Sequence, residues 1–239
     1  MFAVLAAALL FGTTGTARAL GPAEASTLSV GVARMVVGGT GLALLAFTLA
    51  GRHRRRTPDR PRPALSWRPL ALMATTGVAI SLYQPLFFLG TQTNGVAVST
   101  VIALGSAPVL AGILEWVVSR RVPSLLWIGA TALAAAGVVL LGFGGGSGTG
   151  GVDAVGLAAA VGAGACFAVI ANAQRRLLDG GWDPFTVVGA MGVGSAVICA
   201  AAIPFVDLTW ATTPAGLTMA LWLGLATISL AYVLFNWGL

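Results

Sequence analysis

The sequence has no lysine, one histidine, two cysteines and seven acidic residues, and this scarcity excludes several classes of protein. Only 8% of its 239 residues are charged, whereas a soluble domain carries about 25%. Hydrophobic residues make up 57% of the chain, and no soluble fold could cover that much apolar surface. The chain must therefore be an integral membrane protein with little mass outside the bilayer.

The few reactive residues give no support to a metal site, a disulfide or a cofactor. Cys166 and Cys199 both lie inside apolar runs, where they are expected to be small packing residues. His53 has no second His or Cys beside it, and its only acidic neighbour is Asp59. An enzyme acting on lipid would need His, Asp or Glu clustered near one membrane face, but the acids are single and scattered. We therefore predict no metal, no cofactor and no enzyme.

All of the basic charge comes from arginine, and it lies in short gaps between apolar runs. That placement is typical of cytoplasmic membrane loops rather than of a nucleic-acid face, so no nucleic-acid partner is predicted. The dense stretch Arg52–Arg68 also suits anionic lipid heads, as a secondary role.

Eight runs are long enough to cross a bilayer, which needs roughly 20 apolar residues per helix. We therefore predict an all-α integral membrane fold. The predicted helices lie near Phe2–Leu20, Ser26–Ala50, Trp67–Gly90, Gly95–Val118, Leu125–Phe143, Val155–Leu178, Pro184–Phe205 and Gly216–Leu239. The first is not read as a secretory signal, because no positive residue precedes its apolar run.

Arginines occupy alternate gaps, namely Arg52–Arg68, Arg120–Arg121 and Arg175–Arg176, and only Arg18 breaks the pattern. The positive-inside rule then predicts a multi-pass protein of the cell (inner or plasma) membrane with a cytoplasmic amino terminus.

The glycine run Gly142–Gly151 is typical of a linker, since the Lys-Ser/Thr of a phosphate loop does not follow it. We predict a first five-helix repeat over 1–143, a linker over 144–154 and an incomplete second repeat of three helices over 155–239. A repeat with an odd number of spans must have its copy inverted in the membrane.

Two features place polar groups at membrane depth. The hairpin Leu82–Arg121 has internal prolines Pro85 and Pro108 and a predicted turn at Thr91–Gly95. Prolines free carbonyls that hydrocarbon cannot satisfy, so the hairpin favours a ligand cavity; simple packing kinks, with hydroxyls bonded to their own helix, are the alternative.

The second feature is Arg34, which costs roughly 2.5–3.5 kcal/mol at the centre of a span. It is expected to meet Thr13, Thr14 or Thr16 and the carbonyl end of the first helix. It either meets a substrate carboxylate or ties the first two helices together.

The predicted substrate-binding residues share polar or aromatic side chains within or beside spans. They are Thr13, Thr14, Arg34, Tyr83, Gln84, Asn94, Thr100, Ser106, Asn172, Asn236 and Trp237. The amide of Asn236 can form hydrogen bonds with both the donors and the acceptors of a zwitterion. Trp237 could bind substrate or could equally anchor its helix at the membrane interface.

Several stretches resemble EamA-type carriers of the drug/metabolite transporter superfamily. They are AALLFGTTGTA (Ala7–Ala17), VARMVVGG around Arg34, Leu82–Ala111 with its Asn94-Gly95-Val96-Ala97 and Ala107-Pro108-Val109, and AYVLFNWGL (Ala231–Leu239). The resemblance covers essentially the whole chain. Phe11 stands where the family commonly has Trp, and Ser119-Arg120 stands where Gly-Glu is common.

The resemblance implies a ten-helix fold of two inverted repeats, of which the last two helices are missing here. It also implies a secondary transporter that moves a small polar metabolite, an amino acid or similar, by alternating access, with export as the expected direction. Proton coupling and a homodimer stay open. The alternative is a truncated or non-transporting membrane protein, and whether the chain is a fragment of a longer protein stays open.

Overall fold

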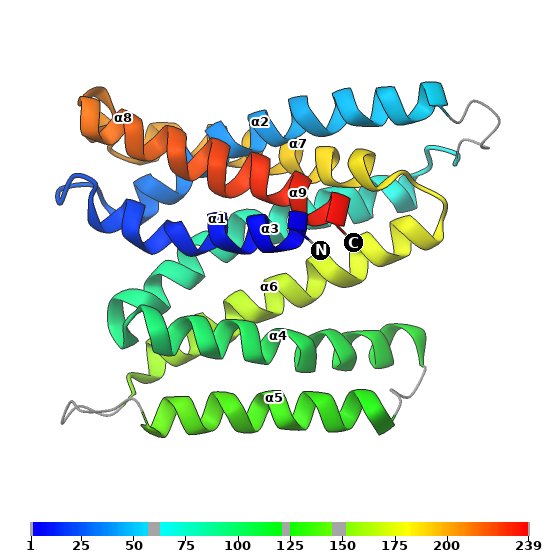
Figure 1. Cartoon of the computed structure of the whole chain (residues 1–239), viewed down its shortest axis with the longest axis horizontal. Helices are drawn as coiled ribbons and strands as arrows, with labels where there is room; N and C mark the ends of the chain where they lie inside the picture. Colours follow the sequence, from blue (N-terminus) through cyan, green and yellow to red (C-terminus); the bar gives the residue numbers. More distant parts are fainter. Residues whose placement is uncertain (1, 57–62, 121–124, 145–151, 239) are drawn as a thin grey trace. The chain divides into compact units, whose positions relative to one another are not determined.

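The computed structural model describes residues 2–56, 63–120, 125–144 and 152–238 (Figure 1). These residues are overwhelmingly helical and include no strand, which confirms the predicted all-α fold. Among them, seven helices are long and apolar enough to cross a membrane. The chain is thus an all-helical integral membrane protein.

The elements follow the predicted spans in order. They are α1 (Phe2–Ala19), α2 (Thr27–Arg56), α3 (Trp67–Asn94), α4 (Val96–Ser119), α5 (Leu125–Gly144), α6 (Ala154–Asp179), α7 (Pro184–Ala202), the short η1 (Ile203–Phe205) and η2 (Thr209–Thr212), α8 (Pro214–Leu221), the π-helical η3 (Trp222–Leu230) and α9 (Ala231–Gly238). The last three form one continuous eighth span. α5 fills the fifth predicted span, and its apolar stretch Trp127–Gly137 is not among the seven helices above.

Two helices run further than predicted. α2 continues through the arginines to Arg56, and α3 continues through most of the predicted turn to Asn94. The hydroxyl of Thr91 donates to Phe88 O at 2.9 Å and that of Thr93 to Leu89 O at 3.1 Å, so these polar residues bond to their own helix instead of breaking it. The turn shrinks to Gly95, whose φ of 79° lies in the region that glycine favours.

The helices form two compact units, which are described separately. Unit 1 comprises Met1–Ser81 and Ala173–Leu239, and unit 2 comprises Leu82–Asn172. Each unit draws on both halves of the predicted repeat. The division into repeats at the glycine linker stays a prediction, and most of that linker lies outside the described residues.

Unit 1 is built around α2, which packs against α7 on one side and η3 on the other, while α1 lies along α9 (Figure 1). Glycines let these backbones approach closely: a Cβ added at Gly39 would lie 2.6 Å from Gly192 O, and one at Gly77 would lie 2.8 Å from Gly194 Cα. Near the start of α2, the buried Trp210 Nε1 donates to Ser29 Oγ at 2.8 Å. The contacts at Gly39 and Ser29 hold α2 within the unit, and the contact at Gly77 joins α3 to α7.

Arg18, the exception to the charge pattern, has a local structural role in unit 1. Its guanidinium donates to Pro22 O at 3.3 Å and to Ala25 O at 2.5 Å. These carbonyls belong to the short connection between α1 and α2. Arg18 therefore closes that connection.

In unit 2, α4 and α5 lie side by side (Figure 1). Gly112 of α4 leaves room for the ring of Trp127 on α5. α6 packs closely on the end of α3 at Gly90, where an added Cβ would lie 3.2 Å from Gly156 O. Both internal prolines, Pro85 and Pro108, lie within continuous helices.

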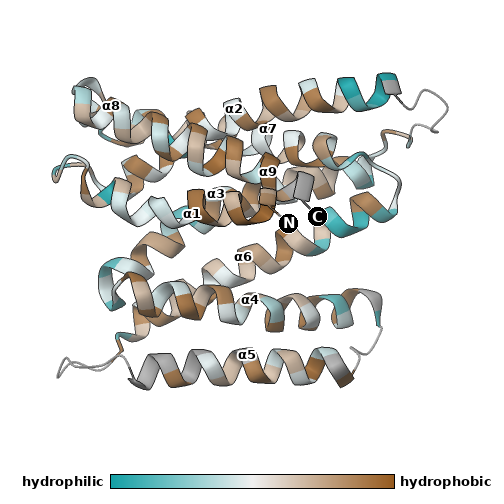
Figure 2. Ribbon diagram, viewed as in Figure 1, coloured by the Kyte–Doolittle hydropathy of each residue, from teal (hydrophilic) through white to brown (hydrophobic). Residues whose placement is uncertain are grey.

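Apolar side chains cover the outside of the helices, as a bilayer requires. Figure 2 shows brown ribbon along most of their length and teal at the arginine-bearing end of α2. Leu9, Leu133 and Leu140 are each more than 70% exposed on helix faces. Such residues would be costly in water but match the hydrocarbon of a membrane.

Candidate functional site

Arg34 is the charged side chain most deeply enclosed in unit 1. It lies on α2 and is only 5% exposed. Its Nε donates to Leu223 O at 3.3 Å, and its Nη2 donates to Thr227 Oγ1 at 2.9 Å. Both acceptors are neutral and both belong to η3. These two hydrogen bonds orient the guanidinium.

The backbone of η3 is shaped around this contact. Thr227 Oγ1 donates to Leu223 O at 2.6 Å, so the hydroxyl and Arg34 Nε converge on one carbonyl. A π-helix has one more residue per turn than an α-helix, is rare, and occurs frequently at functional sites. The eighth span therefore departs from regular α-helix where it receives the buried guanidinium.

Small residues bring α2 and η3 close enough for the contact. A Cβ added at Gly38 would lie 2.9 Å from Gly224 O, and one at Gly41 would lie 2.5 Å from Ser229 Oγ. The hydroxyl of Ser229 also donates across the interface to Gly38 O at 2.9 Å. Gly38 and Gly41, which follow Arg34 on α2, thus allow the close approach of η3 that the arginine contact needs.

Helices α1 and α9 line the neighbourhood of Arg34. The rings of Phe11 and Tyr232 meet edge to face at 5.4 Å between centroids, and Tyr232 is close enough to Arg34 for an electrostatic interaction. Thr13 donates to Leu10 O at 2.7 Å and accepts from Trp222 Nε1 at 3.0 Å. The hydroxyl of Thr13 is therefore engaged with Trp222, and the expected contact of Arg34 with α1 stays a prediction.

In unit 2, two predicted amides make helix-to-helix bonds. Asn94 Nδ2 donates to Asp153 O at 3.1 Å, and Asn94 Oδ1 accepts from Asp153 N at 2.8 Å. Asn172 Nδ2 donates to Ala111 O at 3.1 Å and to Ala168 O at 3.0 Å. These bonds join α3 to the start of α6, and α6 to α4.

Tyr83 lies in an aromatic cluster of unit 2. Its ring stacks on Phe87 at 5.4 Å and meets the edge of Phe167 at 4.9 Å. The neighbouring Gln84 is 2% exposed. Aromatic rings and a buried amide thus follow one another on this turn of α3.

The remaining predicted residues have simpler surroundings. Ser106 donates to Ala103 O at 3.2 Å within its own helix, as the packing alternative expects. Thr14 and Thr100 are partly buried and make no hydrogen bond to another described residue. The side chains of Asn236 and Trp237 lie outside the described part of the chain, so their predicted role stays a prediction.

Three polar groups escaped the sequence-based selection of site residues. Thr227 holds Arg34, Ser229 bonds across to α2, and Ser99 is fully buried with no hydrogen-bond partner for its Oγ among the described residues. Each is a small hydroxyl residue within a largely apolar run. The spacing of Leu223 and Thr227, one helical turn apart, was the one available signal.

No group of three or more His, Cys, Asp or Glu side chains gathers within the described ranges, so they offer no candidate metal site. Cys166 and Cys199 are both free thiols. Neutral hydrogen-bonding groups, aromatic rings and one buried cation are what the described residues offer to a ligand.

Comparison with known proteins agrees with this chemistry. Residues 1–143 match the model of the EamA-like transporter family. The chain is 37% identical over 236 residues to the "Uncharacterized transporter YwfM" of Bacillus subtilis (strain 168), an alignment that covers 99% of this chain and 75% of that protein. No solved structure matches.

Proposed function

Because the chain belongs to the EamA-like transporter family, it is a membrane transporter, and we propose that it exports a small polar metabolite by alternating access. The proposed substrate is an amino acid or a compound of similar size that carries a carboxylate. The proposed location is the inner membrane with a cytoplasmic amino terminus, which the arginine-bearing gaps support.

Arg34 carries this proposal. A buried guanidinium in a membrane span is expensive and is a functional candidate by default. Its planar fork matches a carboxylate, which it can bind through two parallel hydrogen bonds. The two acceptors on η3 are neutral and orient the fork, and its positive charge is what an anionic substrate group would pair with.

The eighth span supports movement around this residue. Transporters often place substrate sites where membrane helices depart from regular geometry, because the irregular backbone must then face protein or ligand. In this chain α8, η3 and α9 form one span whose central π-helical segment contacts Arg34. We propose that this segment rearranges between inward-facing and outward-facing states.

The proposal is tested by counterflow in liposomes. Liposomes that contain the purified chain are loaded with each unlabelled amino acid in turn. Their uptake of the same amino acid in labelled form is then compared with the uptake by protein-free liposomes. The proposal expects transient accumulation of at least one amino acid. No accumulation across the panel by a correctly inserted chain would contradict it.

Two variants separate a substrate-reading arginine from a structural one. Arg34→Lys keeps the charge but loses the fork, and we expect flux to fall about ten-fold or more, because a hydrogen bond to a charged group contributes about 1.5–3 kcal/mol. Thr227→Val removes one acceptor of Arg34 and keeps the side-chain volume. If Arg34 binds the substrate carboxylate, Thr227→Val, which keeps the acceptor Leu223 O, lowers the flux less than Arg34→Lys does; equal losses in both variants would assign Arg34 a purely structural role.

A further inference from the structure

One end of unit 1 carries a concentrated positive surface, which we call the arginine face. It consists of Arg52, Arg54 and Arg55 at the end of α2, Arg68 at the start of α3, and Arg175 and Arg176 at the end of α6. Figure 2 shows teal ribbon at the ends of both α2 and α6. The helices meet at this end, because Met73, Leu177 and Val187 form a buried cluster that joins α3, α6 and α7.

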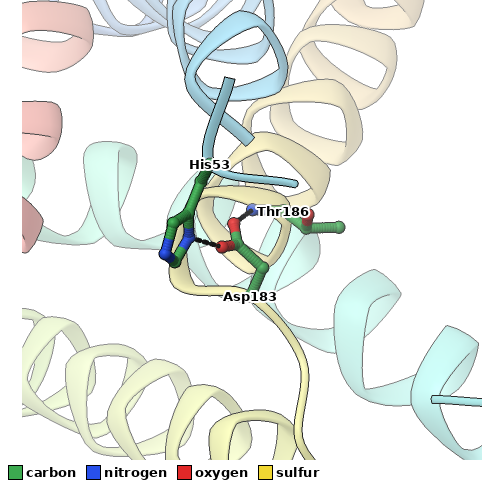
Figure 3. A network of polar contacts seen from close by, with 3 residues as sticks. All are labelled: His53, Asp183 and Thr186. Atoms are coloured by element: carbon green, nitrogen blue, oxygen red, sulfur yellow. Dashed lines mark hydrogen bonds and ion pairs between the residues drawn. The ribbon is translucent and has the colours of Figure 1, made fainter. Parts of the chain in front are cut away.

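Among the described residues at this end, the aspartates Asp179 and Asp183 make no ion pair with the exposed arginines of α2. Asp183 begins α7: its Oδ1 accepts from Thr186 N at 3.1 Å, and its Oδ2 lies 2.6 Å from His53 Nδ1 (Figure 3). Asp179 lies 3.9 Å from Arg175 Nε, with both side chains about 70% exposed, so this pair is weak. Asp183 is therefore committed to His53 and α7, and Asp179 offsets little.

The contact between His53 and Asp183 also orients the end of α2. His53 points toward α7 and packs edge to face on Phe185 at 6.5 Å. Successive residues of an α-helix are turned by about 100°, so Arg52 and Arg54 flank His53 and Arg55 points away from α7. All three arginines are exposed, and none makes a hydrogen bond or ion pair with another described residue.

These guanidinium groups lie at the depth of lipid headgroups. The last apolar residue of α2 is Ala50, and Arg55 follows five residues later, or about 7.5 Å along the helix. A headgroup layer is roughly 5–7 Å thick on each side of the hydrocarbon. Trp67, 73% exposed with Arg68 Cζ 5.6 Å from its ring centroid, has the character of a residue at the membrane interface.

We propose that the arginine face binds the phosphate groups of anionic phospholipids, with Arg54 and Arg55 as the principal donors. Two adjacent guanidinium forks can each take two phosphate oxygens. Each cation near an anionic bilayer surface strengthens binding about five-fold. This site would select anionic lipid from a mixed bilayer independently of any transported substrate.

The test uses the full chain in phosphatidylcholine bilayers that contain trace spin-labelled phosphatidylglycerol or spin-labelled phosphatidylcholine. Electron paramagnetic resonance gives the preference of the protein's lipid shell for the anionic lipid. We expect a clear preference with the unchanged chain and a several-fold smaller preference for R54Q/R55Q. The matched control R120Q/R121Q, which removes two adjacent arginines elsewhere, should keep the original preference. An unchanged preference in R54Q/R55Q, or equal losses in both pairs, would overturn the proposal.

Two further arms need no variant. Raising sodium chloride from about 0.01 M to about 1 M shortens the Debye length from about 30 Å to about 3 Å, so the preference should collapse; a salt-independent preference would contradict an electrostatic site. Inorganic phosphate should reduce the preference no more than chloride at equal ionic strength. A stronger effect of phosphate would assign the face to a soluble phosphate and overturn the lipid site.

Discussion

Replacing Gly39 by alanine should destabilise the protein by forcing α2 away from α7. An added Cβ would lie 2.6 Å from Gly192 O and 2.6 Å from Ser195 Oγ, and the first of these is backbone that cannot rotate away. Reaching the 3.4 Å of ordinary contact from 2.6 Å requires a displacement of about 0.8 Å. Overpacking of this kind costs about 1–3 kcal/mol.

Gly51→Ala is the matched control for this change. Gly51 lies on the same helix, and an added Cβ would have no heavy atom within 4 Å. Its effect should stay within about 0.5 kcal/mol, as for other surface substitutions. The free energy of unfolding would be measured by titrating dodecyl sulfate into mixed micelles and following helicity by circular dichroism. Equal stabilities of the two variants would refute close backbone packing between α2 and α7.

Two other changes test the connections around unit 1. Trp210→Phe removes the hydrogen bond from Nε1 to Ser29 Oγ and should lower the free energy of unfolding by about 1–3 kcal/mol. The same change at the exposed Trp67 should lower it little, and equal losses in the two variants would contradict a structural role of the bond. Hydrogen bonds from the backbone N–H and the hydroxyl of Thr209 hold the pKa of Asp207 below its ordinary value. Its contribution to stability is therefore present above the unfolded pKa and lost as the pH falls through the folded pKa. In thermal unfolding below about pH 4, Asp207→Asn should remove part of the pH dependence; an identical pH profile would count against the contact.

The positions of the spans could be predicted because bilayer thickness fixes how many apolar residues a helix needs. α3, α5 and α7 begin at Trp67, Leu125 and Pro184, as predicted. The ends of α2 and α3 could not be placed, since polar residues stay helical wherever they reach solvent or bond to their own backbone. Hydropathy marks where a helix leaves the hydrocarbon, and the helix itself continues further.

The candidate site was predictable in part for a related reason. Arg34 stands out because a charge in an apolar run is costly, so composition alone singles it out. Its partners could not be found this way, because Leu223 and Thr227 lie 189 and 193 residues further along the chain. Nor could Asn94 be assigned, since nothing in the local sequence shows that its amide faces the backbone of Asp153.

The most direct test of the account is whether Arg34 recognises the carboxylate of a transported compound. An amino acid found by counterflow would be added to the purified chain, and its affinity compared with that of its carboxamide analogue by thermal stabilisation. The account predicts that the amino acid raises the unfolding temperature of the unchanged chain. The carboxamide should give the unchanged chain a much smaller increase, and so should the amino acid with Arg34→Lys. Equal stabilisation of the unchanged chain and of Arg34→Lys by the amino acid would contradict the account.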